Sequence, residues 1–386
     1  MKKSFFIFLF SLISFSLLYA QNNNALELIT QYGYVFPTNK FLNGTNTGKP
    51  VDRVKSMAAR YIIHTDGSKD WHQMYNYIEY GFGAYFASFN EPKHLGNAMA
   101  IYSFVYSPIV SWGKFTLKND LVIGLSYVQK HWSLNNVENI SIGSHLNCFI
   151  QEGFLLDYKI SNHFQLALGV NVSHISNGAT KRPNKGINSL SSQLNLRYNF
   201  YDTEINYIKD KPQFKKGYDF VLSAFGGFYH DYAEMHQYAL TDARRYHNRT
   251  FYAFGLTTTA YKRLSFKNNL GLGFNWGYDD LADNYFKTEN NELISTTTPF
   301  SHRLNLTCFL SYEYKINHFS ALAEIGYYLI RQTSEQSTSN FFQRVGLRYN
   351  IFDNLFLTTA IRASNLSVAH YIEWGIGYRF KLLSQN

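Results

Sequence analysis

The sequence predicts an all-β protein, a transmembrane antiparallel β-barrel of roughly 14–16 strands. Three observations lead to this prediction. Aromatic residues make up 18% of the 386 residues and charged residues only 16%, whereas soluble domains average about 25% charged residues. The mean hydropathy of −0.26 is too low for a bundle of membrane helices. Stretches of alternating apolar and polar residues recur along the chain, as expected for strands that face lipid on one side.

The counts of proline and cysteine exclude several other classes of protein. With 7 Pro and 2 Cys, the chain cannot be a disulfide scaffold, a Cys-rich zinc module or a Pro-rich disordered protein. The formal net charge of +9 suits an anionic membrane surface, and no nucleic-acid motif accompanies it.

The first twenty residues have the features of a secretory signal peptide. Lys2 and Lys3 precede an apolar run over residues 5–18, and Ala20 stands before Gln21 at a suitable cleavage site. We therefore predict that residues 1–20 are removed, with an uncleaved anchor helix as the alternative. Any membrane residence of residues 21–386 must then be as strands.

Residues 164–177 show the strand pattern most clearly. Even-numbered positions are mostly apolar, and odd-numbered positions are mostly small or polar. Residues 190–200 and 371–380 repeat this alternation. Because side chains at i and i+2 share one face of a strand, we expect the apolar face to meet lipid and the polar face to line the barrel interior. A soluble sandwich or a lipid-binding barrel would instead bury the apolar face, and is the alternative.

The predicted strands are joined by alternating short and long connections, as in bacterial barrels with short periplasmic turns and long external loops. With the N-terminus inside, the strand over residues 164–176 runs outward, so His174 and Ser176 lie near the outer leaflet. The short connections are 111–114, 158–163, 261–265, 314–318 and 352–354; the long ones are 37–52, 129–144, 177–189, 229–248 and 278–298.

An internal echo predicts two related halves. Residues 158–164 (YKISNHF) recur as residues 314–319 (YKINHF). Residues 196–199 (LRYN) recur as residues 347–350. Aligned on these segments, Leu329 and Arg331 stand where the first half has His174 and Ser176. Similar barrel turns without duplication would give the same echo. The boundary is predicted at residues 209–216, which divides the chain into 21–204 and 205–386.

One constellation of side chains suggests chemistry. His174 and Ser176 are two residues apart on a strand and share the lipid-facing side. Asn188 has the same parity on the next strand, and the intervening loop returns it beside this pair. Polar groups at the border of the hydrocarbon are unfavourable unless they are paired. We therefore predict a catalytic set in which Ser176 is the nucleophile, His174 the base and Asn188 the group that orients the imidazole.

The loop after this strand supplies further candidates. Asn177, or backbone N–H groups near Ser176 and Gly178, could stabilise an oxyanion. Lys181, Arg182 and Lys185 could bind the phosphates of a lipid headgroup. The alternative is that His174 and Ser176 are interfacial polar residues and that Ser-Asn-Gly only starts a turn.

The segment His174-x-Ser176-Asn177-Gly178, followed by Pro183-Asn184-x-Gly186-Ile187, resembles the signature of PagL-type lipid A 3-O-deacylases. Residues 27–37 and 95–98 also resemble longer relatives, the acyloxyacyl hydrolases. The resemblance covers residues 25–204.

This resemblance implies an eight-stranded barrel in the bacterial outer membrane that hydrolyses an ester-linked acyl chain of lipid A in the lipopolysaccharide. It also implies that Asn177 and Asn184 shape the site or bind the oxyanion. The family has a Glu where this chain has Asn188, and an Asn cannot supply negative charge to an imidazolium. Residues 205–386 then either extend one larger barrel or form a second barrel-like half.

The same spacing resembles outer-membrane phospholipase A, which has an Asn at the position of Asn188. That resemblance implies a phospholipid substrate, Ca²⁺ dependence and a dimer, whereas the deacylase needs no cofactor. A non-enzymatic barrel or channel is the third alternative. The sequence leaves the oligomeric state open.

Other candidate sites are weaker. One loop carries several residues of types that bind metals, and a second loop is acidic. Both are more simply explained as solvated external loops. We therefore predict no metal site. We expect both cysteines to be free apolar residues. The residues are His230, Asp231, Glu234 and His236 in the first loop, Asp279, Asp280, Asp283, Glu289 and Glu292 in the second, and Cys148 and Cys308.

Overall fold

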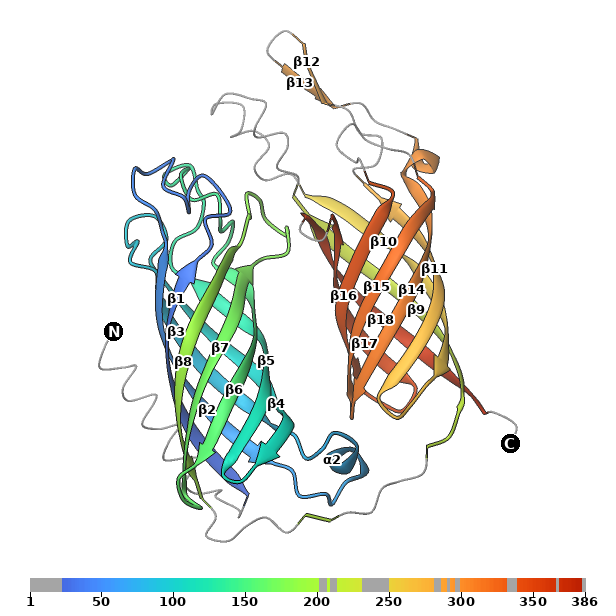
Figure 1. The fold of residues 1–386 in the computed structure, drawn as a ribbon. Helices are drawn as coiled ribbons and strands as arrows, with labels where there is room; N and C mark the ends of the chain where they lie inside the picture. Colours follow the sequence, from blue (N-terminus) through green and yellow to red (C-terminus); the bar gives the residue numbers. More distant parts are fainter. Residues whose placement is uncertain are drawn as a thin grey trace. The chain divides into compact units, whose positions relative to one another are not determined.

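A computed structural model shows two closed antiparallel β-barrels of eight strands each, one in each half of the chain (Figure 1). The chain divides into two compact units, and each unit has one barrel at its centre. The structure describes residues 23–200, 207–208, 214–230, 250–280, 286–289, 292–295, 299–331, 339–365 and 368–383. The predicted signal peptide and most of the predicted boundary at residues 209–216 lie outside these ranges.

The first barrel is formed by eight consecutive strands, and β8 returns to pair with β1 from Ala25↔Asn199 to Val35↔Ser189. A five-residue helix, α2 (Asp70–Met74), lies in the connection between β2 and β3. The strands are β1 (Asn24–Val35), β2 (Arg53–His64), β3 (Glu79–Ser88), β4 (Asn97–Trp112), β5 (Phe115–Val128), β6 (Leu146–Lys159), β7 (Phe164–Ser176) and β8 (Ile187–Asn199).

The second barrel closes in the same way, because β18 pairs with β9 from Ile372↔Phe228 to Leu383↔Gly217. A small hairpin, β12 (Phe286–Glu289) and β13 (Glu292–Ser295), and a 3-10 turn, η1 (Phe300–Arg303), lie between two of its strands. The wall consists of β9 (Gly217–Tyr229), β10 (Phe251–Arg263), β11 (Asn268–Asp279), β14 (Leu304–Ile316), β15 (Phe319–Ile330), β16 (Phe341–Asn350), β17 (Leu355–Ser364) and β18 (Val368–Leu383).

The predicted all-β fold is confirmed, and of the two predicted arrangements the structure has the second. Residues after 204 do not extend one large barrel, because β8 finds its last partner in β1 and leaves no edge to which β9 could add. Within the described residues, no helix has the length and apolar character needed to cross a membrane.

The barrel walls are apolar outside and polar inside, as the alternation predicts. In β7, Leu168 and Val170 are 61% and 54% exposed, whereas Ala167 and Asn171 are 5% and 1% exposed. Because no other element of the first barrel covers Leu168 or Val170, the exposed surface is suited to contact hydrocarbon chains.

Buried ion pairs and aromatic rings fill the interior of the first barrel. Arg60 is 2% exposed, and its Nη1 lies 2.9 Å from Asp120 Oδ1. Its guanidinium carbon lies 4.5 Å from the ring centroid of Phe104. At the N-terminal end of β1, Arg197 pairs with Glu27 and Glu79 at 3.1 and 2.8 Å. Each buried charge therefore has an opposite charge in contact.

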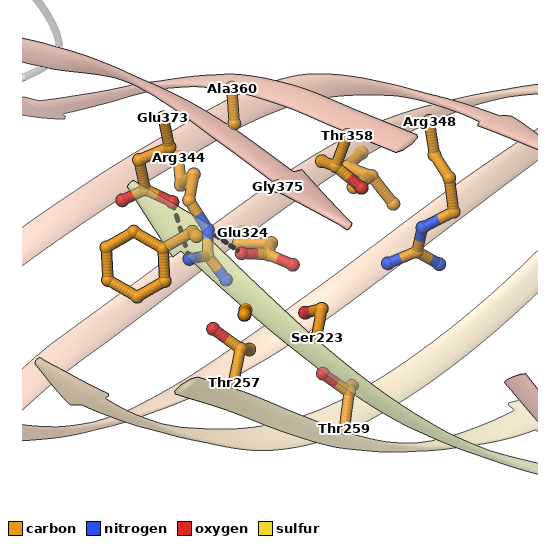
Figure 2. Close-up of a pocket in the computed structure, with 13 residues that line it drawn as sticks. Ser223, Thr257, Thr259, Glu324, Arg344, Arg348, Thr358, Ala360, Glu373 and Gly375 are labelled. Atoms are coloured by element: carbon orange, nitrogen blue, oxygen red, sulfur yellow. Dashed lines mark hydrogen bonds and ion pairs between the residues drawn. The ribbon is translucent and has the colours of Figure 1, made fainter. Parts of the chain in front are cut away.

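The interior of the second barrel follows the same principle. Figure 2 shows Arg344 between Glu324 and Glu373, and its Nη1 lies 3.0 Å from Glu373 Oε2. Beside this group lies a cavity of about 30 Å³, which has room for one or two waters. Among the described residues, Arg348 Nε and Thr358 Oγ1 at its wall are buried without a protein partner. Water is the occupant that suits such atoms.

In the first barrel most long connections lie at one end and the short turns after β4 and β6 at the other, and the exception is the long β2–β3 connection, which carries α2 at the short-turn end (Figure 1). In the first barrel, the connections after β1, β5 and β7 are long, whereas Ser161 and its neighbours form a tight turn closed by Ile160 N–H to Phe164 O at 3.0 Å. Apart from the β2–β3 connection, this distribution agrees with the predicted alternation of long and short connections.

The internal echo occupies equivalent local positions in the two barrels. Phe164 opens β7 opposite Tyr198, and Phe319 opens β15 opposite Tyr349. However, β8 closes its barrel, whereas β16 is followed by two further strands. The repeated segments are therefore similar hairpins at different places in the strand order.

Asp120→Asn is expected to lower the free energy of unfolding by about 3–5 kcal/mol, because it leaves Arg60 without its opposite charge in the barrel interior. Urea unfolding of the full chain in lipid vesicles, followed by tryptophan fluorescence, measures the change.

Asp52→Asn is the matched control. Asp52 lies 3.8 Å from Arg53 in an exposed ion pair, so the loss should stay below about 1 kcal/mol. Equal losses for the two variants would contradict a structural role for the buried pair.

Candidate active site

Strand pairing brings His174 opposite Asn188. The register of β7 and β8 makes them direct partners, and His174 Nδ1 lies 2.6 Å from Asn188 Oδ1. The pair below them on the same face is Val172 and Leu190, which are 49% and 46% exposed. The imidazole and the amide therefore stand on the outer wall of the barrel, directly above lipid-facing apolar side chains.

This hydrogen bond determines what the imidazole can do. An amide oxygen only accepts, so Nδ1 carries the proton and donates it to Asn188 Oδ1. The other nitrogen, Nε2, is then left as an acceptor in the neutral ring. An orienting partner on one nitrogen and a basic second nitrogen is the arrangement required of a general base.

Ser176 is the last residue of β7. It follows His174 by two positions and so has the same parity, at about 6.5 Å along the strand. The next residue already belongs to the loop, where Gly178 and Ala179 have φ of 60° and 67°. These left-handed conformations turn the chain sharply after Ser176, and Gly178 adopts its φ at little energetic cost.

Asn177 and Asn184 brace this loop. Asn184 Oδ1 accepts the backbone N–H of Asn177 at 3.3 Å, and Asn177 Nδ2 donates to Lys181 O at 2.8 Å. Thr180 donates its N–H to Asn177 O at 3.2 Å. The two asparagines therefore shape the backbone around the end of β7, and the side-chain amide of Asn177 is engaged with the loop itself.

The three basic residues predicted to bind phosphate lie on the same loop. Lys185 is exposed, and Lys181 and Arg182 are partly exposed. The neighbouring connection packs closely against them, because a Cβ on Gly143 would lie 2.1 Å from Lys181 O. Only glycine permits this close approach of the two backbones.

The structure also contains a Ser–His contact that the sequence analysis did not find. Ser364 Oγ lies 2.9 Å from His370 Nε2 in the second barrel. The two residues end β17 and begin β18, where the register shifts at Arg362/Ala363. Since they are not at i and i+2 on one strand, strand parity gives no signal for their contact.

No group of three or more metal-binding side chains occurs among the residues that the structure describes. The predicted loop of His230, Asp231, Glu234 and His236 lies outside these residues apart from His230. In the acidic loop, Asp280 pairs with Arg303 at 2.6 Å, and Asp279 accepts the Tyr229 hydroxyl. The side chains of Asp283, Glu289 and Glu292 are outside the described part. Both cysteines, Cys148 and Cys308, are free.

The two halves of the chain match two family models. Residues 56–199 match the lipid A 3-O-deacylase PagL, and residues 216–382 match the C-terminal domain of acyloxyacyl hydrolase. The two ranges correspond to most of the first barrel and nearly all of the second. A search of curated proteins gives no significant match.

Similar solved structures are outer-membrane barrels. The crystal structure of the outer membrane enzyme PagL is 16% identical, covers 44% of this chain and 97% of its own, and has a TM-score of 0.29. The crystal structure of Neisserial surface protein A is 8% identical. The match covers 46% of this chain and 97% of the Neisserial protein, with a TM-score of 0.31. A mutant of the Rh. blastica porin is 9% identical. The match covers 92% of this chain and 100% of the porin, with a TM-score of 0.19.

At these identities and TM-scores, the assignment rests on the two family models, which agree with the fold and with the resemblance of residues 174–187. The chain belongs to the family of PagL-type lipid A 3-O-deacylases and acyloxyacyl hydrolases, β-barrels of the bacterial outer membrane.

Proposed function

We propose that this protein is a serine hydrolase that removes an ester-linked acyl chain from lipid A, with Ser176 as nucleophile and His174 as base. The observation that carries the proposal is the 2.6 Å contact between His174 Nδ1 and Asn188 Oδ1 on the outer wall of the first barrel. It supports an imidazole with a fixed orientation at the lipid border, in a chain whose family is described as a lipid A deacylase.

In the first half of the reaction, His174 Nε2 takes the proton of Ser176 Oγ while Oγ attacks the ester carbonyl. The tetrahedral intermediate collapses, the C–O bond to the sugar breaks, and the imidazolium returns its proton to the sugar oxygen. In the second half, water is deprotonated by Nε2 and attacks the acyl carbonyl; the bond between the acyl carbon and Ser176 Oγ breaks, and the imidazolium returns its proton to Oγ. The products are a free fatty acid and a lipid A with one hydroxyl group in place of the ester.

Asn188 has an orienting role in this scheme. Its oxygen accepts the Nδ1 proton throughout the cycle, so the imidazole keeps the tautomer in which Nε2 is basic. A neutral amide supplies less stabilisation to the imidazolium than a carboxylate would. We therefore expect a working but moderate catalyst.

The loop after Ser176 supplies the other functions. We assign the oxyanion contact to backbone N–H groups of residues 177 and 178, the donors closest in sequence to the nucleophile. The hydrogen bond from Asn177 N–H to Asn184 Oδ1 is long, at 3.3 Å. The N–H group can therefore exchange this weak acceptor for a developing oxyanion. Lys181, Arg182 and Lys185 would attract the lipid A phosphates.

The barrel interiors argue against a channel. Arg60 and Phe104 are each 2% exposed in the first barrel, and Arg344 is 7% exposed between its two glutamates in the second. Interiors packed in this way are typical of small barrels filled by their own side chains rather than of water-filled channels. The outer wall is therefore the better place to look for function.

A phospholipase A-like activity is the second candidate, and the identity of residue 188 favours it. The resemblance to outer-membrane phospholipase A implies an Asn at this position. The two candidates share the reaction and differ in the lipid and in a requirement for Ca²⁺.

Ser176→Ala is expected to reduce ester hydrolysis by at least about 10³-fold, because no other group replaces the nucleophile. The purified full chain in detergent is assayed on lipid A and on phospholipid, each with Ca²⁺ or with a chelator, and released fatty acid is measured by mass spectrometry. Hydrolysis of lipid A without Ca²⁺ supports the deacylase; Ca²⁺-dependent hydrolysis of phospholipid supports the second candidate.

Ser364→Ala is the matched control, since Ser364 also contacts a histidine but lies in the second barrel. It should keep wild-type activity. If Ser364→Ala is inactive and Ser176→Ala is active, the nucleophile has been placed in the wrong barrel.

Asn188→Ala is expected to lower kcat about ten-fold, since the imidazole loses its orienting hydrogen bond. Asn188→Glu should instead raise kcat above wild type, because a carboxylate stabilises the imidazolium that forms in the transition state. Steady-state kinetics on the same lipid measures both. A kcat that is unaffected by either change would remove Asn188 from the catalytic set.

Asn184→Ala is expected to lower kcat several-fold, on the order of the 0.5–1.5 kcal/mol of one hydrogen bond. The backbone N–H of Asn177 needs only a neutral acceptor, so Asn184→Ser, whose hydroxyl oxygen can accept without adding negative charge beside the oxyanion, should recover part of the activity. Equal kcat values for the two variants would show that the brace does not contribute to the site.

A further inference from the structure

A stack of three aromatic rings stands at the rim of the second barrel, on its outer side. Phe254 on β10 and Tyr278 on β11 are direct cross-strand partners, and their ring centroids lie 4.7 Å apart. Phe300 on η1 adds a third ring, 5.3 Å from that of Tyr278. The interplanar angles are 20° and 26°, so the three rings are nearly parallel. Phe300 ends the stack and is 64% exposed.

A short turn presents the ring of Phe300. Pro299 precedes it with a φ of −56°, a value that the proline ring itself fixes. His302 N–H donates to Pro299 O at 3.1 Å. Leu304 N–H donates to Ser301 O, and Leu304 is the first residue of β14. The turn is therefore anchored to the barrel wall, and the ring is oriented before any ligand arrives.

An ion pair borders the stack. Arg303 Nη1 lies 2.9 Å from the Tyr278 hydroxyl and 2.6 Å from Asp280 Oδ1. The hydroxyl of Tyr278 donates to the same carboxylate oxygen at 3.0 Å, and Asp280 N–H donates to Tyr252 O at 2.9 Å. The side chains of Arg303 and Asp280 are 18% and 26% exposed. The two charged groups are thus held in place and still reach the surface.

This end of the second barrel faces the cell exterior. The connections after β9 and β11 run from Tyr229 to Phe251 and from Asp279 to Leu304, and long connections are external in bacterial barrels. The layer above the hydrocarbon on that side consists of the sugars of lipopolysaccharide. A pyranose ring has a face of C–H groups, which suits the negative face of an aromatic ring. Its hydroxyl groups donate to a carboxylate and accept from a guanidinium.

Membrane anchoring alone does not account for this arrangement. Aromatic girdles line the interfaces of barrels, and Phe254 and Tyr278 have positions typical of a girdle. Phe300 differs, because it lies beyond the strand ends and the arginine of the ion pair belongs to the same short turn. A ring that only anchors a strand in lipid needs no fixed carboxylate and guanidinium at its side.

We propose that Phe300, Asp280 and Arg303 form a carbohydrate-binding platform on the second barrel, and that its ligand is a pyranose ring of lipopolysaccharide. The sugar stacks on the exposed face of Phe300, and its hydroxyl groups bond to the two charged side chains. The platform goes beyond the proposed hydrolysis, because none of its residues belongs to the catalytic set. Pyranose rings occur both in lipid A and in the polysaccharide attached to it, so the experiment separates these two sources.

The test measures binding of lipid-free polysaccharide, released from lipopolysaccharide by mild acid, to the full chain in detergent micelles by calorimetry. Phe300→Ala should weaken binding about 10-fold, because the stacking contact is lost. Phe300→Trp keeps a flat ring and should bind as wild type. Asp280→Ala should weaken binding roughly three- to ten-fold. Circular dichroism checks that each variant retains its strands.

Phe352→Ala is the matched control. Phe352 is 69% exposed, but it lies in the turn between β16 and β17 at the other end of the second barrel. This variant should bind the polysaccharide as wild type does. An equal loss in Phe352→Ala and Phe300→Ala would refute the platform, because any exposed ring would then have the same effect.

Lipid A without polysaccharide is the second probe, and it is offered to Ser176→Ala with and without Phe300→Ala, so that no ester is cleaved. Loss of polysaccharide binding in Phe300→Ala assigns the site to the saccharide chain, and loss of lipid A binding alone assigns it to the sugar rings of lipid A. If neither probe depends on Phe300, the ring is an ordinary interfacial residue and the proposal is wrong. Since the polysaccharide carries no lipid A ester, this result is independent of whether Ser176 is a nucleophile.

Discussion

The structure depends on one constraint, which is that every strand must pair on both edges before it can reside in a membrane. The bilayer offers no water to an open edge, so an unpaired row of N–H and C=O groups would be strongly unfavourable. The pairing of β8 with β1 and of β18 with β9 satisfies this constraint twice. Closure also constrains the tilt and stagger of the strands, and within this wall the β7–β8 hairpin sets the register that places His174 opposite Asn188.

Closure then determines which side chains meet lipid. Once the wall is continuous, each residue of a strand has only two environments, and those environments alternate. Most polar residues of the first barrel are turned inward, where Arg60 and Arg197 find opposite charges. His174 and Asn188 have the opposite parity. Their side chains are unfavourable for the fold, and each partly compensates the other through the hydrogen bond between the imidazole and the amide. Polar residues that the fold does not need are the natural candidates for function.

Strand parity explains how far the sequence could predict this molecule. It identified the wall, the direction of the apolar face and the juxtaposition of His174 with Asn188, because a hairpin of known parity can bring them together in few ways. It could not identify closure, since a strand that ends one barrel has the same alternation as a strand in the middle of a larger one. It also gave no signal for Ser364 and His370, because the bulge beside Arg362 changes the parity of β17 relative to β18.

The two barrels differ in what their outer walls carry at the echoed hairpin. In the first barrel the strand that begins with Phe164 ends in a histidine and a serine, and the loop that follows contains Asn177 and Asn184. In the second, the strand that begins with Phe319 has Leu329 at the position that aligns with the histidine, and Leu329 is 50% exposed as an ordinary wall residue. The described interiors of both barrels contain buried ion pairs. Stability is therefore provided in each half separately, and the proposed chemistry is confined to the half whose outer wall departs from the apolar rule.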